Sequence, residues 1–379
     1  MADESPFLLR LSGAASWVRC AANPMMNKRP EALQLEALGD TTVRDEGTAM
    51  HWAAQTLASG IDAVVVGTVA PNGIAIDDEL LDGALYYLDV LREYDVPKWE
   101  IEQQLSAPSI HRQCGGTPDA YGLNYARKHV YEADLKGGYV NVEVFPNGQL
   151  IGYSSAIFDK YPEIDDNWKI TFVIIQPRSY HRDGPVREYT TTFGMLREHW
   201  NALRGAAERA VSANAPATAG DQCTNCNARH VCSVALEASA NMCELSGEPE
   251  IVALTDAALD YELLRLQAAE RLIKARLTGL TSYAAHMIKR GASLPHFVME
   301  RGSGRLHWVE GKEKEAIALG DMFGKNLRKD EKAITPLQAS KIIDPALVAA
   351  YSERKPGEVK LTRFDANKVA KAFSNLKVE

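Results

Sequence analysis

The spacing of apolar residues changes along the chain, and it predicts helices first and strands afterwards. Apolar residues recur at helical spacing over 44–59 and 76–94. Alternating apolar and polar residues then predict three successive strands over 98–106, 116–124 and 128–136, with turns between them. The first part of the chain is therefore expected to form helices followed by a run of paired strands.

Three further elements extend this pattern. A helix is expected over 149–159, a strand over 169–176 and a long helix over 191–212. The strand contains the run ITFVII, whose β-branched residues favour a sheet. The resulting order, helix, three strands, helix, strand and helix, predicts a mixed α/β fold.

The later part of the chain reads as a separate domain. Residues 212–220 are small and polar and indicate a linker, and an amphipathic helix is expected over 256–290. We place the boundary near Pro249, which gives a first domain of residues 1–248 and a mainly helical second domain of residues 249–379.

The second domain is expected to hold a hairpin and short helices. The hairpin is predicted over 297–309, around Gly302 and Gly304, and helices over 335–343 and 365–376. Mixed basic and aromatic residues here are typical of DNA contact, although an ordinary hairpin and helix surface and an oligomerisation or partner-docking module remain open. These residues are Arg301, Arg305, Trp308, Lys325, Arg328 and Lys329.

Composition is that of an ordinary globular protein, with 24% charged and 46% hydrophobic residues. No apolar run reaches the roughly 18 residues that a membrane helix needs, so no membrane partner is expected. The start, MADESPFLLRLSG, is acidic where a signal peptide is basic, which favours the cytoplasm. The net charge is −8, but residues 281–379 hold 18 Lys/Arg against 12 Asp/Glu. This basic end indicates either phosphate contacts or an unevenly charged solvated surface.

Two carboxylates fall on neighbouring predicted strands. Asp119 follows Gly-Gly-Thr-Pro, and Asp134 begins the triplet Asp-Leu-Lys that ends at Lys136. Strand alternation places Glu132, Asp134 and Lys136 on one side, and a hairpin brings Asp119 beside them. Such oxygen ligands suit Mg²⁺ or Mn²⁺, and the lysine could orient water or stabilise a phosphate. A plain surface ion pair is the alternative.

Three more residues complete the candidate site. His51 lies on the helix predicted over 44–59 and could point inward as a metal ligand, although a helical histidine is usually a packed or exposed residue. Gln149 and Tyr153 are four residues apart on the helix that follows Lys136, so they share one face.

The cysteines form a second candidate site. Cys20 lies near the start, and Cys223, Cys226 and Cys232 are spaced C-x2-C-x5-C about two hundred residues later. This grouping indicates a metal or an iron–sulfur cluster. A zinc site that uses Cys243, or His230 in its place, and a set of inert buried thiols remain open. Cys114 is read as a core or free thiol.

Taken together, these residues resemble the RecB-like branch of the PD-(D/E)XK nucleases, through the order GTAMH, GGTPDAYG, EADLK and QLIGY. That resemblance implies a restriction-endonuclease-like core. His51, Asp119, Asp134 and the Leu135 carbonyl would hold the metal, Lys136 would be the catalytic lysine, and Gln149 and Tyr153 would bind substrate or orient the lysine. AddB-type and CRISPR-associated RecB-like nucleases carry one cysteine before the core and three after it. The resemblance thus implies a [4Fe–4S] cluster on Cys20, Cys223, Cys226 and Cys232.

The whole chain also resembles a phage- and prophage-borne family known only as a domain of unknown function. The matching stretches are SWVRC, DEGTAMH, IQPR, MERGSGRLHW and ITPLQASK. The expected function is a Mg²⁺- or Mn²⁺-dependent DNA exonuclease in phage-type recombination, acting on duplex ends or single strands in the host cytoplasm. A single-strand annealing protein is a plausible partner, and a homo-oligomer is possible. A structure-specific endonuclease or nickase and a catalytically silent DNA-binding module are the alternatives.

Overall fold

The computed structural model describes residues 6–36, 42–60, 64–245, 256–301, 306–309, 311–329, 332–354 and 359–363. It divides into two compact units, Met1–Gly279 and Leu280–Glu379. The division falls within helix α9 (Asp256–Lys289), and the boundary predicted near Pro249 lies outside the described residues. Across the described part of the chain, no helix has both the length and the apolarity that crossing a membrane requires.

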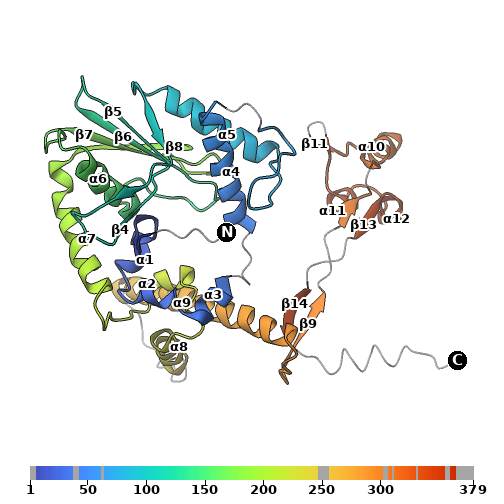
Figure 1. The fold of residues 1–379 in the computed structure, drawn as a ribbon. Helices are drawn as coiled ribbons and strands as arrows, with labels where there is room; N and C mark the ends of the chain where they lie inside the picture. The colour runs from blue at the N-terminus through green and yellow to red at the C-terminus, as the bar shows by residue number, and fades with distance from the viewer. Residues whose placement is uncertain are drawn as a thin grey trace. The chain divides into compact units, whose positions relative to one another are not determined.

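A mixed five-stranded sheet forms the centre of the first unit (Figure 1). Its strand order is β2-β5-β6-β7-β8. The central strands β6 and β7 run parallel, and the other neighbours pair antiparallel. Helix α6 (Gly148–Lys160) connects the parallel pair, as a crossover connection must. The strands are β2 (Trp99–Ile101), β5 (Ala120–Asn124), β6 (His129–Leu135), β7 (Lys169–Ile175) and β8 (Val186–Thr192).

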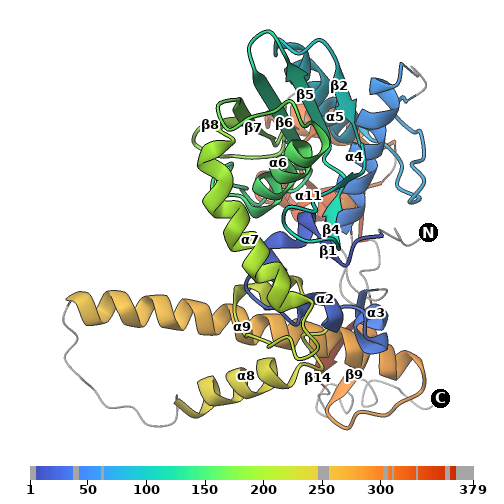
Figure 2. The same cartoon turned by 60° about the vertical axis from the view of Figure 1, so that its left-hand side comes forward.

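Helices cover both faces of this sheet (Figure 2). Helices α4 (Thr42–Ala58) and α5 (Asp78–Arg92) pack on one face, against Ala133 and Leu135 of β6. Helices α6 and α7 (Arg197–Ala210) pack on the other face, against Val130. Side chains of β6 therefore alternate between two buried cores, which leaves Asp134 on the α6 side.

Side-chain caps fix the starts of two of these helices. Asp77 accepts a hydrogen bond from the Leu80 amide and begins α5. Asn147 accepts hydrogen bonds from the Gln149 and Leu150 amides and begins α6. Each cap satisfies amide groups that have no partner inside the helix. The Asn147 cap fixes the first turn of α6, which carries Gln149.

The N-terminal segment is joined to the same core by a second sheet of order β1-β4-β3. Strand β1 (Leu9–Arg10) runs parallel to β4 (Cys114–Gly116), which pairs with β3 (Leu105–Ser106). Leu11 then packs so closely on α6 that a Cβ at Gly152 would lie 2.5 Å from its Cδ2. The segment is therefore built into the fold from Leu9 onward.

Two of the predicted strands are each split in the structure. The strand expected over 98–106 becomes β2 and β3, which belong to different sheets, and the chain turns at Glu102 with φ of 49°. A positive φ interrupts an extended strand, and glutamate gives no sequence warning of it. The strand expected over 116–124 becomes β4 and β5, separated by Thr117-Pro118-Asp119. Both breaks lie beside the candidate site.

The helix expected over 191–212 begins later than predicted. Strand β8 occupies residues up to Thr192, and α7 begins only at Arg197. β8 is the edge strand of the sheet and reads VREYTTT, so it lacks the apolar alternation that would have predicted it. Pairing with β7 rather than local pattern determines its structure.

The second unit is mixed rather than mainly helical where the structure describes it. The hairpin predicted over 297–309 is wrong, because its two halves pair with later strands. β9 (Phe297–Arg301) pairs with β14 (Val359–Arg363), and β10 (Leu306–Trp308) pairs with β13 (Ser352–Arg354). The other described elements are α10 (Glu313–Met322), β11 (Arg328–Lys329), β12 (Lys332–Ala333), α11 (Pro336–Ala339) and α12 (Pro345–Ala349). The helix predicted over 365–376 lies outside the described residues.

Two residues of the basic and aromatic set have structural partners within this unit. Trp308 packs against a small core that includes Leu327, and its indole Nε1 donates a hydrogen bond to the Ile334 carbonyl at 2.8 Å. Arg328 forms an ion pair with Asp321, with Nη1 2.6 Å from Oδ1. Base stacking by Trp308 therefore finds no support in this packing.

Candidate active site

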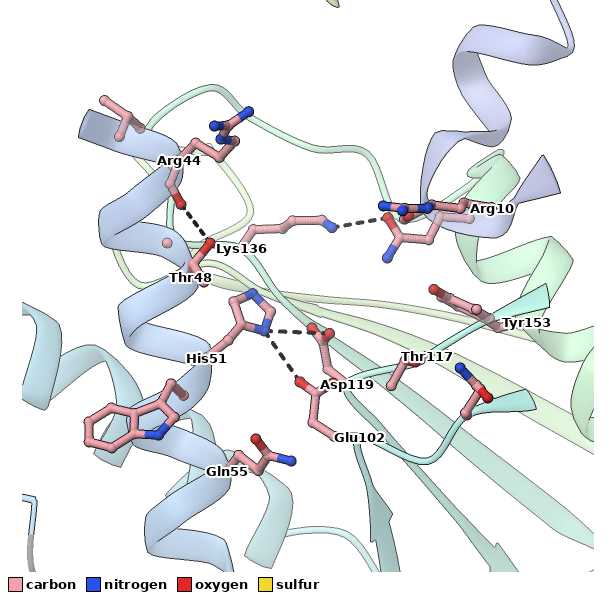
Figure 3. Close-up of a pocket in the computed structure, with 18 residues that line it drawn as sticks. Arg10, Arg44, Thr48, His51, Gln55, Glu102, Thr117, Asp119, Lys136 and Tyr153 are labelled. Atoms are coloured by element: carbon pink, nitrogen blue, oxygen red, sulfur yellow. Dashed lines mark hydrogen bonds and ion pairs between the residues drawn. The ribbon is translucent and has the colours of Figure 1, made fainter. Parts of the chain in front are cut away.

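One cavity of about 840 Å³ in the first unit gathers most of the predicted site residues (Figure 3). His51, Asp119, Lys136, Gln149 and Tyr153 all line it. They come from α4, the turn before β5, the end of β6 and the first turns of α6. The sheet and the helices on its two faces thus deliver side chains from four separate segments to one space.

One histidine and two carboxylates lie together on the α4 side of this cavity. His51 Nδ1 lies 3.5 Å from Asp119 Oδ1 and 3.8 Å from Glu102 Oε1. Among the described residues, these three are the ones whose potential ligand atoms all lie within 4.8 Å of one another. One nitrogen and two carboxylate oxygens at this spacing could hold a single divalent cation.

Sequence reasoning missed Glu102. The residue lies directly beyond β2, and its amide donates a hydrogen bond to the Asp119 carbonyl at 3.0 Å. Because Ile101 pairs with Ala120 in the antiparallel β2–β5 ladder, Glu102 and Asp119 are the next pair of facing residues. The register of the β2–β5 pair, had it been known, would have identified Glu102.

Asp134 and Lys136 form the second half of the site. Lys136 Nζ lies 2.8 Å from Asp134 Oδ2 and donates a hydrogen bond to Gln149 Oε1 at 3.1 Å. Gln149 Nε2 in turn donates to Asp134 Oδ1 at 2.7 Å. The Asp134 side chain is only 4% exposed. The three side chains therefore hold one another, and Gln149 fixes the ammonium group from the α6 side.

A hydrogen bond between a side chain and the backbone links the two halves of the site. Asp119 Oδ2 accepts from the Leu135 amide at 2.7 Å, between Asp134 and Lys136 in the chain. The Leu135 side chain is buried in the core on the α4 and α5 side. Asp119 is thereby fixed to the strand that carries Asp134. Metal ligation by the Leu135 carbonyl stays a prediction.

Several carboxylates and few cationic side chains lie close together in the site, and this shifts the pKa values of its residues. Burial opposes the charged form of His51, but Asp119, Glu102 and Asp134 outweigh it and raise the His51 pKa to about 9. Burial raises the pKa of Asp134 to about 6, although Lys136 opposes this rise. The histidine and lysine thus carry the positive charge that offsets the carboxylates. A bound cation would take over this role.

Tyr153 reaches the cavity because a glycine leaves it room. A Cβ at Gly116 would lie 2.8 Å from the Tyr153 hydroxyl oxygen. The tyrosine is almost fully buried, and burial together with nearby Asp119 and Asp134 raises its pKa above the ordinary value. Tyr153 therefore presents a protonated hydroxyl beside the carboxylates, as a donor rather than a base.

The four predicted cysteines meet at a second cavity of the first unit. Cys20, Cys223, Cys226 and Cys232 all line it. The Ala22 amide donates to the Pro216 carbonyl at 3.1 Å, so backbone contact also joins the N-terminal segment to this loop. The N-terminal segment and the loop of residues 216–232 are thus brought together around the thiols.

Thiol spacing bears on which group could bind there. In a tetrahedral zinc site the sulfur atoms lie about 3.8 Å apart, from zinc–sulfur bonds of about 2.3 Å. No three of the described thiols come within 4.8 Å of one another. The cavity is small, about 20 Å³, so binding of a four-iron cluster would widen it.

The other candidate thiols and the candidate histidine do not join this cavity. Its described lining does not include His230, which lies against Gly279 of α9. Cys114 is fully buried in the core between the sheet and α6. The Cys243 side chain lies outside the described residues.

Comparison with known proteins places the chain in a family. The model of DUF2800, described as a protein of unknown function, matches residues 7–357. The chain belongs to the DUF2800 family. A candidate exonuclease from Eubacterium rectale, known from a crystal structure, is 9% identical, with a TM-score of 0.30 over 54% of this chain and 79% of its own. No curated protein matches the sequence.

In this DUF2800 protein, the segment IQPR supports the loop that follows Lys136. Gln176 Nε2 donates to the Gly138 and Val140 carbonyls at 2.7 and 2.8 Å. The buried Arg178 donates to Glu46 Oε2 at 2.7 Å and to the Gly137 carbonyl at 3.3 Å. These residues therefore position the loop and α4 without lining the cavity.

Two glycines allow α4 to approach this loop. A Cβ at Gly137 would lie 2.9 Å from the Gly47 Cα. That contact is with backbone, which cannot move aside as a flexible side chain can. The glycines of GTAMH and of the segment after EADLK thus let His51 lie opposite Lys136.

Proposed function

We propose that this DUF2800 protein is a metal-dependent DNA exonuclease with a RecB-like PD-(D/E)XK core. The observation that carries the proposal is the convergence of His51, Glu102 and Asp119 beside the Asp134–Lys136 pair around one cavity. A surface ion pair would leave Asp134 exposed, whereas its side chain is 4% exposed and held by two partners. Buried, mutually coupled titratable groups in a cleft are typical of active sites.

The donor set fits Mg²⁺ or Mn²⁺. His51, Asp119 and Glu102 offer a nitrogen and carboxylate oxygens, and Asp134 and the Leu135 carbonyl are further candidate ligands on the neighbouring strand. Such mixed sites accept Mn²⁺ readily, and the carboxylates suit Mg²⁺. When bound, the metal would neutralise charge on a phosphodiester and make water a stronger nucleophile.

The protein side chains have separate tasks in this reaction. Lys136 stays protonated, because Asp134 and Asp119 raise its pKa against the effect of burial. Its ammonium group is held by Asp134 and Gln149 at the cavity wall, where it can stabilise charge on the phosphate or orient water. Tyr153 can donate a hydrogen bond to a substrate oxygen. The reaction is hydrolysis, in which water attacks phosphorus and the leaving oxygen takes a proton.

Digestion of end-labelled linear duplex DNA with Mg²⁺ or Mn²⁺ tests the assignment. Asp134→Ala and Lys136→Ala should each lower the rate by about 100-fold or more, because each removes charge stabilisation at the phosphate. Lys98→Gln is the control, since Lys98 pairs with Glu100 at the exposed surface. Equal rates in all variants would refute the site.

Glu102 allows a sharper comparison with a neighbouring glutamate. Glu102→Gln removes a candidate ligand, whereas Glu100→Gln changes a glutamate that pairs with Lys98 and does not line the cavity. Glu102→Gln should weaken Mn²⁺ binding by calorimetry and slow digestion, and Glu100→Gln should do neither. Unchanged Mn²⁺ affinity in Glu102→Gln would exclude this glutamate from the site.

Two other functions make different predictions in the same assay. A structure-specific endonuclease or nickase would cut covalently closed circular duplex, which an exonuclease leaves intact. A silent DNA-binding module would bind both forms and cut neither. The convergence of His51, Asp119, Asp134 and Lys136, of which Asp134 is buried and the others are half-buried, favours catalysis over the silent module. In the proposed role, the enzyme acts in the bacterial cytoplasm and supplies single strands to an annealing protein.

We further propose a structural [4Fe–4S] cluster on Cys20, Cys223, Cys226 and Cys232. The convergence of four thiols from two distant segments on one cavity supports this choice. Anaerobically purified protein should contain iron and sulfide and absorb visible light, and Cys20→Ala should lose both. Cys114→Ala, a buried thiol outside the cavity, is the control. Colourless protein with zinc that survives Cys20→Ala would overturn the proposal.

A further inference from the structure

Two arginines lie on the walls of the active-site cavity, and neither belongs to the nuclease motifs. Arg10 comes from β1 and Arg44 from the first turns of α4, and both line the cavity. Figure 3 shows them on opposite sides of the cavity, with the Lys136 side chain between them. Segments far apart in the sequence therefore place a guanidinium group on each side of the catalytic lysine.

The lining of the cavity carries both negatively and positively charged side chains. Glu102 and Asp119 line its inner part, and Asp134, which does not line it, forms an ion pair with Lys136. Carboxylates attract a metal ion but repel the phosphates of a nucleic acid. Binding a polyanion therefore requires cations around the rim. Apart from His51 and Lys136, the cationic residues of the lining are Arg10 and Arg44.

The backbone of each arginine is firmly placed. Arg10 pairs with Gly115 in the β1–β4 ladder, and its carbonyl accepts a hydrogen bond from Trp17 Nε1 at 2.9 Å. The Arg44 carbonyl accepts one from Thr48 Oγ1 at 3.0 Å within α4. The Arg44 side chain is 58% exposed, with its Nε 3.8 Å from Asp45 Oδ1, and Arg10 is exposed as well. Both are exposed side chains on fixed backbone, which suits contact with a flexible chain of phosphates.

We propose that Arg10 and Arg44 bind the phosphates on the two sides of the scissile bond within one polynucleotide strand. The inference rests on the proposed nuclease function and adds the residues that hold the substrate. Planar guanidinium groups match phosphate oxygens and keep their charge at any working pH. The cavity volume of about 840 Å³ lies within the range of ligand clefts and favours a short stretch of one strand.

The salt dependence of DNA binding tests the inference directly. The probe is a fluorescein-labelled single-stranded oligodeoxynucleotide, bound in Ca²⁺ and checked for intact length on a denaturing gel. A plot of the log association constant against log salt has a negative slope. Each lost phosphate contact makes that slope shallower by about 0.7 for a single strand. Arg10→Gln and Arg44→Gln should each produce this change, and the double variant about 1.4.

Two sets of variants separate phosphate contact from a general effect of charge or folding. Arg127→Gln is the matched control, because Arg127 is 64% exposed, pairs with Asp95 and does not line the cavity. Its slope should equal that of the wild type. Arg10→Lys and Arg44→Lys keep the charge and should retain most of the slope. An unchanged slope in the double variant, or an equal change in Arg127→Gln, would overturn the inference.

The two proposals fail in distinguishable ways. Digestion of DNA with an unchanged salt slope in the double variant would overturn the arginine contacts and leave the nuclease standing. Reduced slopes in a protein that digests no DNA would support the phosphate contacts and refute the nuclease. Thermal melting of Arg10→Gln should match the wild type, because the substituted side chain is exposed.

Discussion

Replacing Arg178 with methionine should separate the positioning of the active site from its chemistry. The Arg178 side chain is 4% exposed and lies between Glu46 of α4 and Glu79 of α5, 2.7 and 2.8 Å from their oxygens. It also reaches the Gly137 carbonyl, next to Lys136. Methionine keeps an unbranched apolar stem like that of arginine, but it lacks the guanidinium group and makes none of these contacts. Neither residue of the catalytic pair is altered.

The magnitude follows from how well each partner is shielded from water. Glu46 is 30% exposed, so its charged hydrogen bond contributes about 2 kcal/mol. Glu79 is 55% exposed, which limits that pair to less than about 1 kcal/mol. With the carbonyl contact, Arg178→Met should lower the free energy of unfolding by about 3 kcal/mol.

Urea denaturation measures this loss, and double-mutant cycles divide it between the partners. The coupling of Arg178 to Glu46, measured with Glu46→Gln, should exceed its coupling to Glu79, measured with Glu79→Gln. DNA digestion by Arg178→Met should fall even at temperatures where the protein is folded, because the loop after Lys136 loses a support. A loss below about 1 kcal/mol, or equal couplings, would refute the reasoning.

Two further predictions concern backbone contact and buried charge. Gly137→Ala should destabilise the protein and slow digestion, because its Cβ would lie 2.9 Å from the Gly47 Cα, whereas Gly138→Ala meets open space and should change neither. Equal melting temperatures for the two alanine variants would contradict this. Glu132→Met should raise the free energy of unfolding by about 1–3 kcal/mol, because both buried Glu132 oxygens have no hydrogen-bond partner in the described structure. Denaturant titration at neutral pH measures the change, and a destabilised variant would reveal an essential contact.

The central strands could be predicted because their burial is visible in the residues of each strand itself. The side chains of β6 and β7 are buried on both faces of the sheet. A continuous apolar run such as ITFVII is what a strand buried on both faces requires. β8 could not be found in the same way, since a half-buried edge strand needs few apolar residues. The pairing of β9 with β14 was hidden for another reason. The glycines after β9 indicate a tight turn, while the true partner lies far along the chain.

The residues of the candidate site also fall into those that local sequence predicts and those that long-range pairing brings in. Asp119, Asp134 and Lys136 were found because they occupy recognisable strand ends with short motifs. Glu102 was missed because its place depends on the register of two strands and on a positive φ that its residue type does not announce. Long-range pairing, rather than local pattern, brings this carboxylate to the histidine.

The early position of Cys20 has a consequence for synthesis of the chain. Every predicted catalytic side chain, from His51 to Tyr153, is translated before residue 160. The thiols that face Cys20, and the Pro216 carbonyl that holds the neighbouring backbone, emerge much later. A ribosome therefore delivers the reactive groups well before the loop that secures the N-terminal segment. Closure of the unit around Cys20 therefore has to wait until translation has passed residue 232.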